Sequence, residues 1–253
     1  MNLFCRCLLW ILLLGAFGLA VFWRPVLGLL LFATALLWWW HLSPSNDREW
    51  SPEYARTPWA EVNGDAVLIH NFRNFIYHRG SDPLARWETK TVHLSQLRGL
   101  DFFMNFFGSR HVAHTFLSFD FGPDGFVCTS IEARRERGET YSPWRGLLRQ
   151  YELYYVIGDE RDLIRLRTEY RGQAVHLYRM AEAPTETYRA LFLAYLRSAN
   201  ELRARPHWYH AAFDNCTTNI RLNARSSGFP SAWDWRLLLN GHVDELLYRR
   251  GLI

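Results

Sequence analysis

Residues 111–136 constrain the fold more than any other part of the 253-residue chain. Their sequence, HVAHTFLSFDFGPDGFVCTSIEARRE, consists of two runs of alternating side chains on either side of the tetrad GPDG at residues 122–125. Proline fixes one backbone angle of a turn and glycine tolerates positive φ angles, so the tetrad indicates a tight connection. The two runs therefore predict an antiparallel β-hairpin.

Further strand-like segments surround this hairpin along the chain. They are short runs rich in β-branched or aromatic side chains, at residues 66–69, 89–94, 150–157 and 173–180. From Thr185 onwards the apolar residues follow helical spacing, with Thr185 as the expected cap. Strands followed by helices predict an α+β fold in which helices pack on an antiparallel sheet.

Two uncharged apolar runs precede these segments, at residues 7–23 and 26–42, with Arg24 and Pro25 between them. At 17 residues each, they are at the short end of what spans a bilayer. We predict a transmembrane helical hairpin, with the three tryptophans of residues 38–40 at a lipid interface. A cleaved signal peptide is the alternative for the first run, although it lacks a small-x-small cleavage motif.

The chain therefore divides into three predicted regions. These are a two-helix membrane anchor (1–45), a linker rich in proline, serine and charge (46–62), and a folded domain (63–253). The apolar fraction of 49% excludes general disorder and supplies one large core. Basic residues lie at both ends of the apolar runs, so charge alone leaves the orientation in the membrane open.

Charge and cysteine patterns exclude two classes of function. The formal net charge is +4, but the arginines are interspersed with acidic residues, so no nucleic-acid partner is expected. The four cysteines, Cys5, Cys7, Cys128 and Cys216, show neither CxxC nor Cys/His zinc spacing. We therefore expect no metal and no cofactor, while a disulfide between Cys128 and Cys216 stays open.

Cys216 lies in the polar run FDNCTTNI, where Asp214 and Asn215 are typical helix N-cap residues. In the first turn of a helix, free backbone N–H groups and the helix dipole favour a thiolate and lower the pKa of a cysteine. The same N–H groups could donate to an oxyanion during acyl transfer. The alternative is a small buried residue without chemistry.

A thiolate nucleophile requires a base, and His114 is the histidine that stands out. It lies in an otherwise apolar strand, on the face shared by Phe116 and Ser118. The alternative is a core histidine held by a backbone carbonyl.

A third group should orient the imidazole. If the two glycines of the tetrad face each other, His114 faces Ala133, and a single β-bulge would bring Glu132 opposite it. The alternative role of Glu132 is a solvent-facing partner for one of the two arginines that follow it.

Five stretches in this order resemble one known family. The stretches HTFLSFDF, SIEARRE, QYELYYV, LRT and WYHAAFDNCTTNI resemble the N-terminal periplasmic domain of Lnb-type lipoprotein N-acyltransferases, over about residues 58–250. That family is similar to circularly permuted papain-like, NlpC-type thiol enzymes and to lecithin:retinol acyltransferase. In these enzymes the histidine strand precedes the cysteine helix, as His114 precedes Cys216 here.

The resemblance implies Cys216 as nucleophile, His114 as base and Glu132 as candidate third member. Asn215, Thr217 and Ser118 are the expected substrate-binding residues. The implied protein is a membrane-anchored cysteine acyltransferase or hydrolase of the bacterial inner membrane, with a periplasmic catalytic domain that works through a thioester.

The expected partners are membrane lipids, and the acyl group would come from a phospholipid or a lipoprotein. Two alternatives stay open. One is an amidase or peptidase acting on peptidoglycan peptides through the same cysteine and histidine, and the other is a non-catalytic envelope scaffold.

Overall fold

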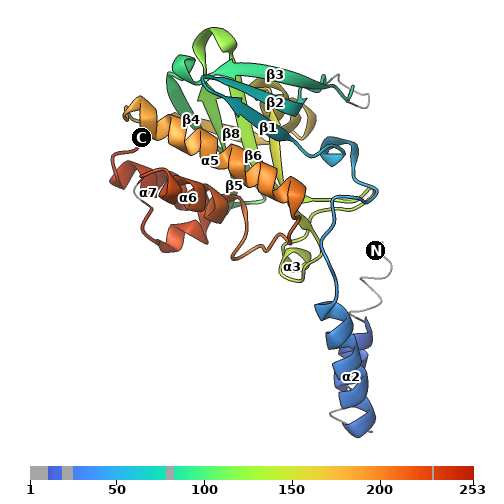
Figure 1. Ribbon diagram of the computed structural model, residues 1–253. Helices are drawn as coiled ribbons and strands as arrows, with labels where there is room; N and C mark the ends of the chain where they lie inside the picture. Colours follow the sequence, from blue (N-terminus) through green and yellow to red (C-terminus); the bar gives the residue numbers. More distant parts are fainter. Residues whose placement is uncertain (1–10, 19–24, 78–82, 230) are drawn as a thin grey trace.

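The computed structural model describes residues 11–18, 25–77, 83–229 and 231–253 (Figure 1). Its centre is an eight-stranded sheet in the order β1-β2-β7-β6-β5-β4-β8, with β3 paired to β2. The strands are β1 (Trp59–Asn63), β2 (Ala66–Arg73), β3 (Trp87–His93), β4 (Gly99–Phe107), β5 (Ser109–Asp120), β6 (Phe126–Arg134), β7 (Glu152–Gly158) and β8 (Ala174–Arg179). The predicted α+β class is confirmed.

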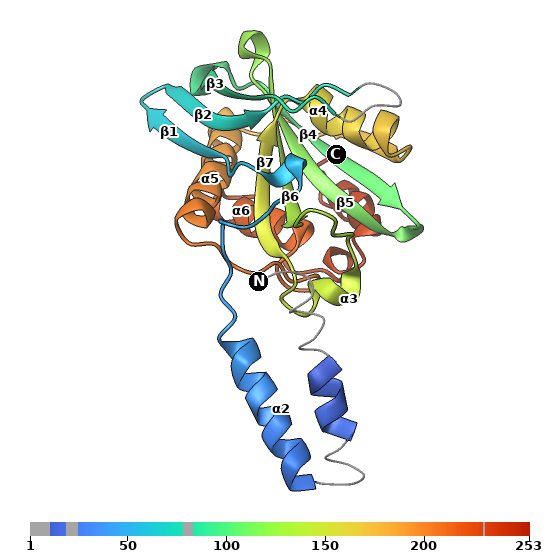
Figure 2. The same ribbon diagram turned by 90° about the vertical axis from the view of Figure 1, so that its right-hand side faces the viewer.

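Helices cover both faces of the sheet, as Figure 2 shows for α4 and α5. The helices are α2 (Pro25–Trp40), α3 (Pro143–Gly146), α4 (Glu160–Arg165), α5 (Thr185–Ala204), α6 (Cys216–Ser226) and α7 (Val243–Arg249). On one face the aromatic ring of Phe119 packs against Phe192 and Tyr195 of α5. On the other face Leu163 of α4 is buried in a second cluster with Phe116.

The sheet is mixed, because β2 and β7 run parallel where Arg73 pairs with Gly158. All other strand pairs are antiparallel, so the predicted antiparallel sheet is correct except at this pair. A Cβ atom at Gly158 would lie 2.5 Å from the carbonyl oxygen of Arg73. The parallel contact therefore depends on a glycine at this position.

The predicted hairpin is formed by β5 and β6, but its register differs by one residue from the expected one. Asp120 pairs with Phe126, so five residues form the turn, and the N–H of Phe121 donates to the carbonyl of Gly125. The two glycines of the tetrad do not face each other, which makes the predicted pairing of His114 with Ala133 wrong. If the observed pairing is extended by two residues beyond Phe116 and Ser130, Glu132 lies opposite His114 without a bulge.

β5 and β6 separate before either strand ends. Their ladder stops at Phe116 and Ser130, although β5 begins at Ser109 and β6 continues to Arg134. Beyond this point β5 stays paired with β4, and β6 stays paired with β7. The sheet therefore divides on the side where His114 projects.

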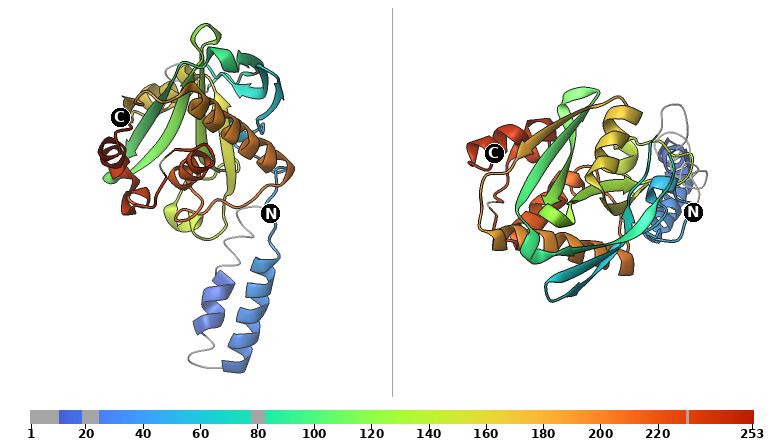
Figure 3. Two further views of the ribbon diagram at one scale, coloured as in Figure 1. Left: turned by 60° about the vertical axis from the view of Figure 1, so that its left-hand side comes forward. Right: turned by 90° about the horizontal axis from the view of Figure 1, so that it is seen from above.

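At the N-terminus, residues 11–18 are helical and lie beside α2, with Leu13 packed near Ala35 (Figure 3). None of the described helices is sufficiently long and apolar to cross a membrane, and α2 has 16 residues. The predicted transmembrane hairpin is therefore not supported. The remainder of its first run and its turn, residues 7–10 and 19–24, lie outside the described part of the chain.

The predicted linker, residues 46–62, packs on the domain instead of standing free. The side chain of Asn46 accepts a hydrogen bond from Arg134 at 2.8 Å, and Trp50 is buried under the same guanidinium group. Residues 59–62 already belong to β1. The aromatic and amide side chains of this segment thus extend the domain towards its N-terminus.

Candidate functional site

Cys216 is the first residue of α6, as the sequence predicts. Asn215 caps the helix through a reciprocal pair of bonds: its side chain accepts from the N–H of Thr218, and its own N–H donates to the Thr218 hydroxyl. This capping box fixes the start of the helix. The thiol therefore lies at the positive end of the helix dipole, where a thiolate is favoured.

His114 meets Cys216 at the point where β5 separates from β6. Burial raises the pKa of the Cys216 thiol, but the positive charge of His114 and its hydrogen bond to the sulfur outweigh burial and lower the pKa to about 7. Burial lowers the pKa of His114, whereas the charges of Glu132 and Cys216 raise it to about 9. Between these two values the pair is a thiolate and an imidazolium.

Glu132 contacts the far side of the same imidazole. Its Oε1 lies 3.1 Å from the Nε2 of His114, and the hydroxyl of Ser130 lies 2.7 Å from both atoms. Because Nε2 is engaged here, we assign the contact with the thiol to Nδ1. The ring is thus held between a carboxylate and a sulfur atom, the arrangement that activates a nucleophile.

Arg167 completes this network from the π-helical turn η4 (Leu166–Tyr170) that follows α4. Its guanidinium group is buried and donates to Glu132 at 2.7 Å and to Ser130 at 3.2 Å. Burial raises the pKa of Glu132, but His114 and Arg167 hold the pKa well below its ordinary value. The carboxylate therefore stays charged while His114 changes its protonation state.

Asn240, the first residue of the short turn η6 (Asn240–His242), reaches Cys216 from the other side. Its Oδ1 accepts from the backbone N–H of Ala113 at 2.8 Å, which fixes the orientation of the amide. Its Nδ2 must then face the helix start, where it lies 3.0 Å from the hydroxyl of Thr217 and 3.9 Å from the sulfur of Cys216. The site thus holds an oriented amide donor beside the thiol of Cys216.

A cleft opens over this network. Polar and titratable residues of the network line it, namely His114, Glu132, Cys216 and Asn240, together with Val112, Tyr141, Pro143, Tyr209, Ala211 and Leu238. The hydroxyls of Tyr141 and Tyr209 lie 3.4 Å apart, and burial raises the pKa of both phenols. The phenols therefore stay neutral and can donate hydrogen bonds in the cleft.

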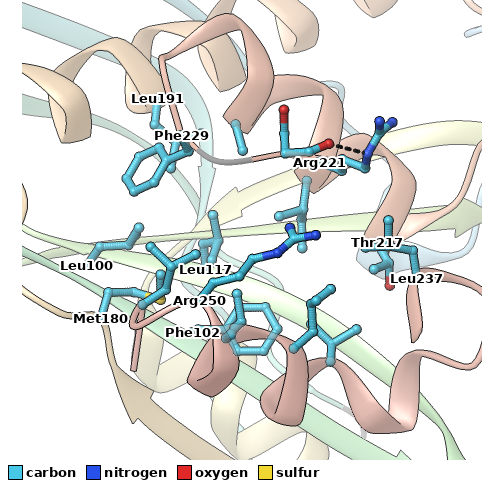
Figure 4. A pocket seen from close by; sticks show the side chains of 17 residues that line it. Leu100, Phe102, Leu117, Met180, Leu191, Thr217, Arg221, Phe229, Leu237 and Arg250 are labelled. Carbon is cyan, nitrogen blue, oxygen red and sulfur yellow. Dashed lines mark hydrogen bonds between the residues drawn. The ribbon is translucent and has the colours of Figure 1, made fainter. Parts of the chain in front are cut away.

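A second cavity lies on the other side of α6 (Figure 4). Its lining is mostly apolar, and of its residues Thr217 is the neighbour of Cys216 in the sequence. The two arginines at its edge donate to backbone carbonyls, Arg221 to Ser231 and Arg250 to Ala232. The described residues that line this cavity include no histidine, cysteine or carboxylate, whereas the first cleft contains all three.

The three predicted substrate-binding residues have different positions. Asn215 lines the cleft and donates from its amide to the carbonyl of Ala211 at 2.7 Å. Thr217 is buried between Thr115 and Asn240. Ser118 is fully buried further along β5 and does not line the cleft. Of the three, only Asn215 is placed to meet a substrate directly.

The sequence left open a disulfide between Cys128 and Cys216, and the structure does not contain this bond. Both Cys128 and Cys216 are free thiols. Cys128 lies on β6 in the cluster beneath α4, and burial raises its pKa well above the ordinary value.

Of the site residues predicted from the sequence, Cys216, His114, Glu132 and Asn215 line one cleft, with Thr217 buried beside them, whereas Ser118 lies apart. Ser130, Arg167 and Asn240 also belong to this network and were not predicted. The sequence profile of the Lnb N-terminal periplasmic domain matches residues 84–241, which is more than half of the chain and includes all of these residues. Searches of curated proteins and of solved structures return no similar protein. The resemblance predicted from the sequence is confirmed, and this chain belongs to the Lnb N-terminal periplasmic domain family.

Proposed function

We propose that this chain is a cysteine acyltransferase or hydrolase of the bacterial cell envelope that works through a thioester on Cys216. One observation carries the proposal: a buried thiol at a helix start is paired with an imidazole that a carboxylate orients. This is the arrangement of nucleophile, base and orienting group that acyl transfer requires. The periplasmic family domain supports a location of the site in the envelope.

In the first step, the Cys216 thiolate attacks the carbonyl carbon of an ester, and the carbonyl electrons move onto oxygen. We expect the backbone N–H of Cys216, at the helix start, and the Nδ2 of Asn240, 3.9 Å from the sulfur, to donate to this oxyanion. The oxyanion then collapses, the bond to the alcohol breaks, and the His114 imidazolium gives its proton to the leaving oxygen. The products of this step are a thioester on Cys216 and a free alcohol.

In the second step, an amine or water attacks the thioester while neutral His114 accepts its proton. The carbon–sulfur bond breaks, the thiolate leaves, and the acyl group ends on nitrogen or oxygen. Glu132 holds its charge throughout and stabilises the imidazolium that forms in each cycle. An amine acceptor makes the protein an acyltransferase, and water makes it a hydrolase.

We propose membrane lipids as partners and a phospholipid or lipoprotein as acyl donor. The cleft lining gives partial support, since Val112, Pro143 and Leu238 are apolar. The lining also contains Arg135, Arg171 and Gln173. The two arginines share one carboxylate, that of Glu53, so a positive charge remains that favours a peptide with carboxylates as a second candidate. A peptidoglycan-peptide amidase or peptidase would use the same cysteine and histidine.

The deciding experiment measures the intact mass of the purified full chain in detergent after incubation with phospholipid or with peptidoglycan fragments. The expected result is a mass increase of one acyl chain on Cys216 that hydroxylamine removes, because hydroxylamine cleaves thioesters. Cleavage of the peptides without an acyl adduct would favour the second candidate. Absence of both, in protein whose Cys216 reacts with iodoacetamide, would favour a non-catalytic scaffold.

A further inference from the structure

The cleft is bordered by large apolar side chains that no other part of the domain covers. We name this border the apolar rim; it comprises Val112, Trp144, Phe213, Trp235, Leu238 and Leu239. Trp144 and Phe213 are each 77% exposed, and the other four are 40–50% exposed. Isolated apolar residues on a surface are ordinary, but a group of this size around a cleft marks an interaction site.

The rim is continuous with the cleft on two sides. On one side, the N–H of Ala211 donates to the carbonyl of Gly146, which joins the loop of Phe213 to α3 and Trp144. On the other side, Leu238 lines the cleft itself. Whatever covers the rim therefore also meets the entrance of the cleft.

The neighbouring helix α2 indicates what that partner is. Exposed apolar side chains surround α2, among them Val26, Leu29, Leu30 and Leu37, and the helix has no charged residue. A helix that is apolar on all sides is covered by hydrocarbon or by a large core, whereas a protein groove covers only one stripe. Such a helix belongs at a lipid phase.

α2 ends on the same side of the domain as α3 (Figures 1 and 2). The guanidinium group of Arg149, three residues after α3, lies 4.5 Å from the ring of Trp39 and 5.8 Å from that of Trp40. Tryptophan and arginine together are favoured at the boundary between head groups and acyl chains. The end of α2 therefore lies near α3, which carries Trp144 of the rim.

We infer that the apolar rim rests on the surface of a lipid bilayer, so that the cleft opens into the head-group region. This inference names the partner surface of the proposed function, but it depends on the rim and α2 and not on the chemistry of Cys216. A lipid substrate could then enter the cleft from the bilayer without crossing water.

The test places a fluorophore on the full chain reconstituted in nanodiscs of phosphatidylcholine and phosphatidylglycerol. Cys5, Cys7 and Cys216 are changed to serine, while the fully buried Cys128 is kept. An NBD group is attached at Phe213→Cys or Trp144→Cys on the rim. The matched control is Phe126→Cys, because Phe126 is 37% exposed at the opposite end of β6.

Nitroxide groups near the lipid head groups should quench roughly half of the NBD emission from the two rim positions, since interfacial side chains lie within a few ångströms of that depth. The emission from Phe126→Cys should hardly change. Equal emission at all three positions would overturn the inference. Blue-shifted rim emission without quenching would overturn it as well, because a protein would then cover the rim.

The labelled protein contains Cys216→Ser and cannot form an acyl adduct, so quenching is independent of catalysis. If the labelled variants are quenched but the wild-type protein never takes up an acyl group, only the proposed function is refuted. If the wild-type protein takes up acyl groups but the rim positions of the labelled variants are not quenched, only the inference that the rim rests on a bilayer is refuted.

Discussion

Cys128 and Cys216, the cysteines in the described part of the chain, are both buried, but the pKa values of their thiols shift in opposite directions. Cys128 is 0% exposed and Cys216 is 6% exposed. Burial acts on both thiols in the same direction, since it disfavours the thiolate. At Cys128 it prevails over the charge of Arg167 and raises the pKa well above the ordinary value. At Cys216 the charge and hydrogen bond of His114 prevail, and the pKa falls to about 7.

The comparison shows that the partner of a thiol decides its chemistry here, and not its exposure. Cys128 lies two residues before Ser130 on the same strand, but its partner on β5 is Ser118 and not a histidine. Five variants can break or sharpen this comparison.

The largest effect is expected for Cys216→Ser. Serine has a far higher pKa than cysteine, so His114 cannot keep it ionised, and acylation by an activated ester should fall by at least about 10³-fold. Intact-mass measurement of the acyl adduct checks this, with Cys128→Ser as the matched control. If the serine variant is labelled at the wild-type rate, another cysteine is the acceptor and the site has been misassigned.

His114→Ala should slow acylation by about 10²- to 10³-fold, because the base and its charge are lost together. In the wild type, alkylation of Cys216 by iodoacetamide should rise through about pH 7, as the thiolate forms. Acyl transfer should decline again above about pH 9, as the imidazolium loses its proton. In the variant, the alkylation midpoint should move upward, since the charge and hydrogen bond of His114 are the largest effects that oppose burial.

The matched control is His111→Ala, on the same strand and exposed to solvent. Its rate and pH profile should match those of the wild type. A profile of His114→Ala that keeps its midpoint near pH 7 would show that the helix start alone lowers the pKa of the thiol.

Asn240→Ala should reduce acylation by about 10²-fold, the usual effect of losing one oxyanion donor. Alkylation by iodoacetamide involves no oxyanion, so its rate at Cys216 should stay near the wild-type value. A loss of acylation without a loss of alkylation distinguishes transition-state stabilisation from a general loss of structure. Parallel losses in both reactions would instead make Asn240 a structural residue.

Glu132→Gln should slow acylation by about tenfold, because nucleophile and base stay in place while the imidazolium loses its countercharge. The charge of Glu132 raises the pKa of His114, so the decline of activity should begin at a lower pH in this variant. The pH profile is the decisive measurement. An unchanged profile would mean that Ser130 and Arg167 hold His114 without the carboxylate.

The smallest effect on activity is expected for Cys128→Ser. A hydroxyl replaces a fully buried thiol beneath α4, which should lower the free energy of unfolding by roughly 1–3 kcal/mol without changing the acylation rate. Chemical denaturation measures the first quantity and intact mass the second. A slower acylation in protein that remains folded would show that Cys128 supports the site.

Local sequence patterns were sufficient to find the centre of this site. The cap residues before Cys216 predicted the helix start, and the solitary imidazole in an apolar strand singled out His114. Both features depend on neighbours within a few residues, which a sequence displays directly. The register was missed by one residue because a five-residue turn and a four-residue tetrad look alike until the backbone closes.

Residues brought in by long-range packing could not be found in this way. Arg167 lies 35 residues from Glu132, in a segment whose alternating charges are typical of a solvent-exposed helix. Asn240 follows Cys216 by 24 residues, within an apolar stretch that suggests core. Ser130 could not be predicted for another reason. Its contacts with His114 and Glu132 depend on the separation of β5 from β6 at that residue, which the sequence does not reveal.

The attachment of residues 46–62 to the domain has a consequence for how the protein meets its substrate. Asn46 is held by Arg134 and by the carbonyls of Leu202 and Arg203. The N–H of Ser45 donates to Glu152, and Arg48 donates to the carbonyl of Ser43. Only residues 41 and 42 therefore lie between α2 and the first of these contacts, and two residues reach at most about 7 Å. If α2 lies at a bilayer, this short connection holds the domain close to the membrane surface. Its turnover would then follow the surface density of diffusing lipids, in two dimensions, and not a concentration in the surrounding solution.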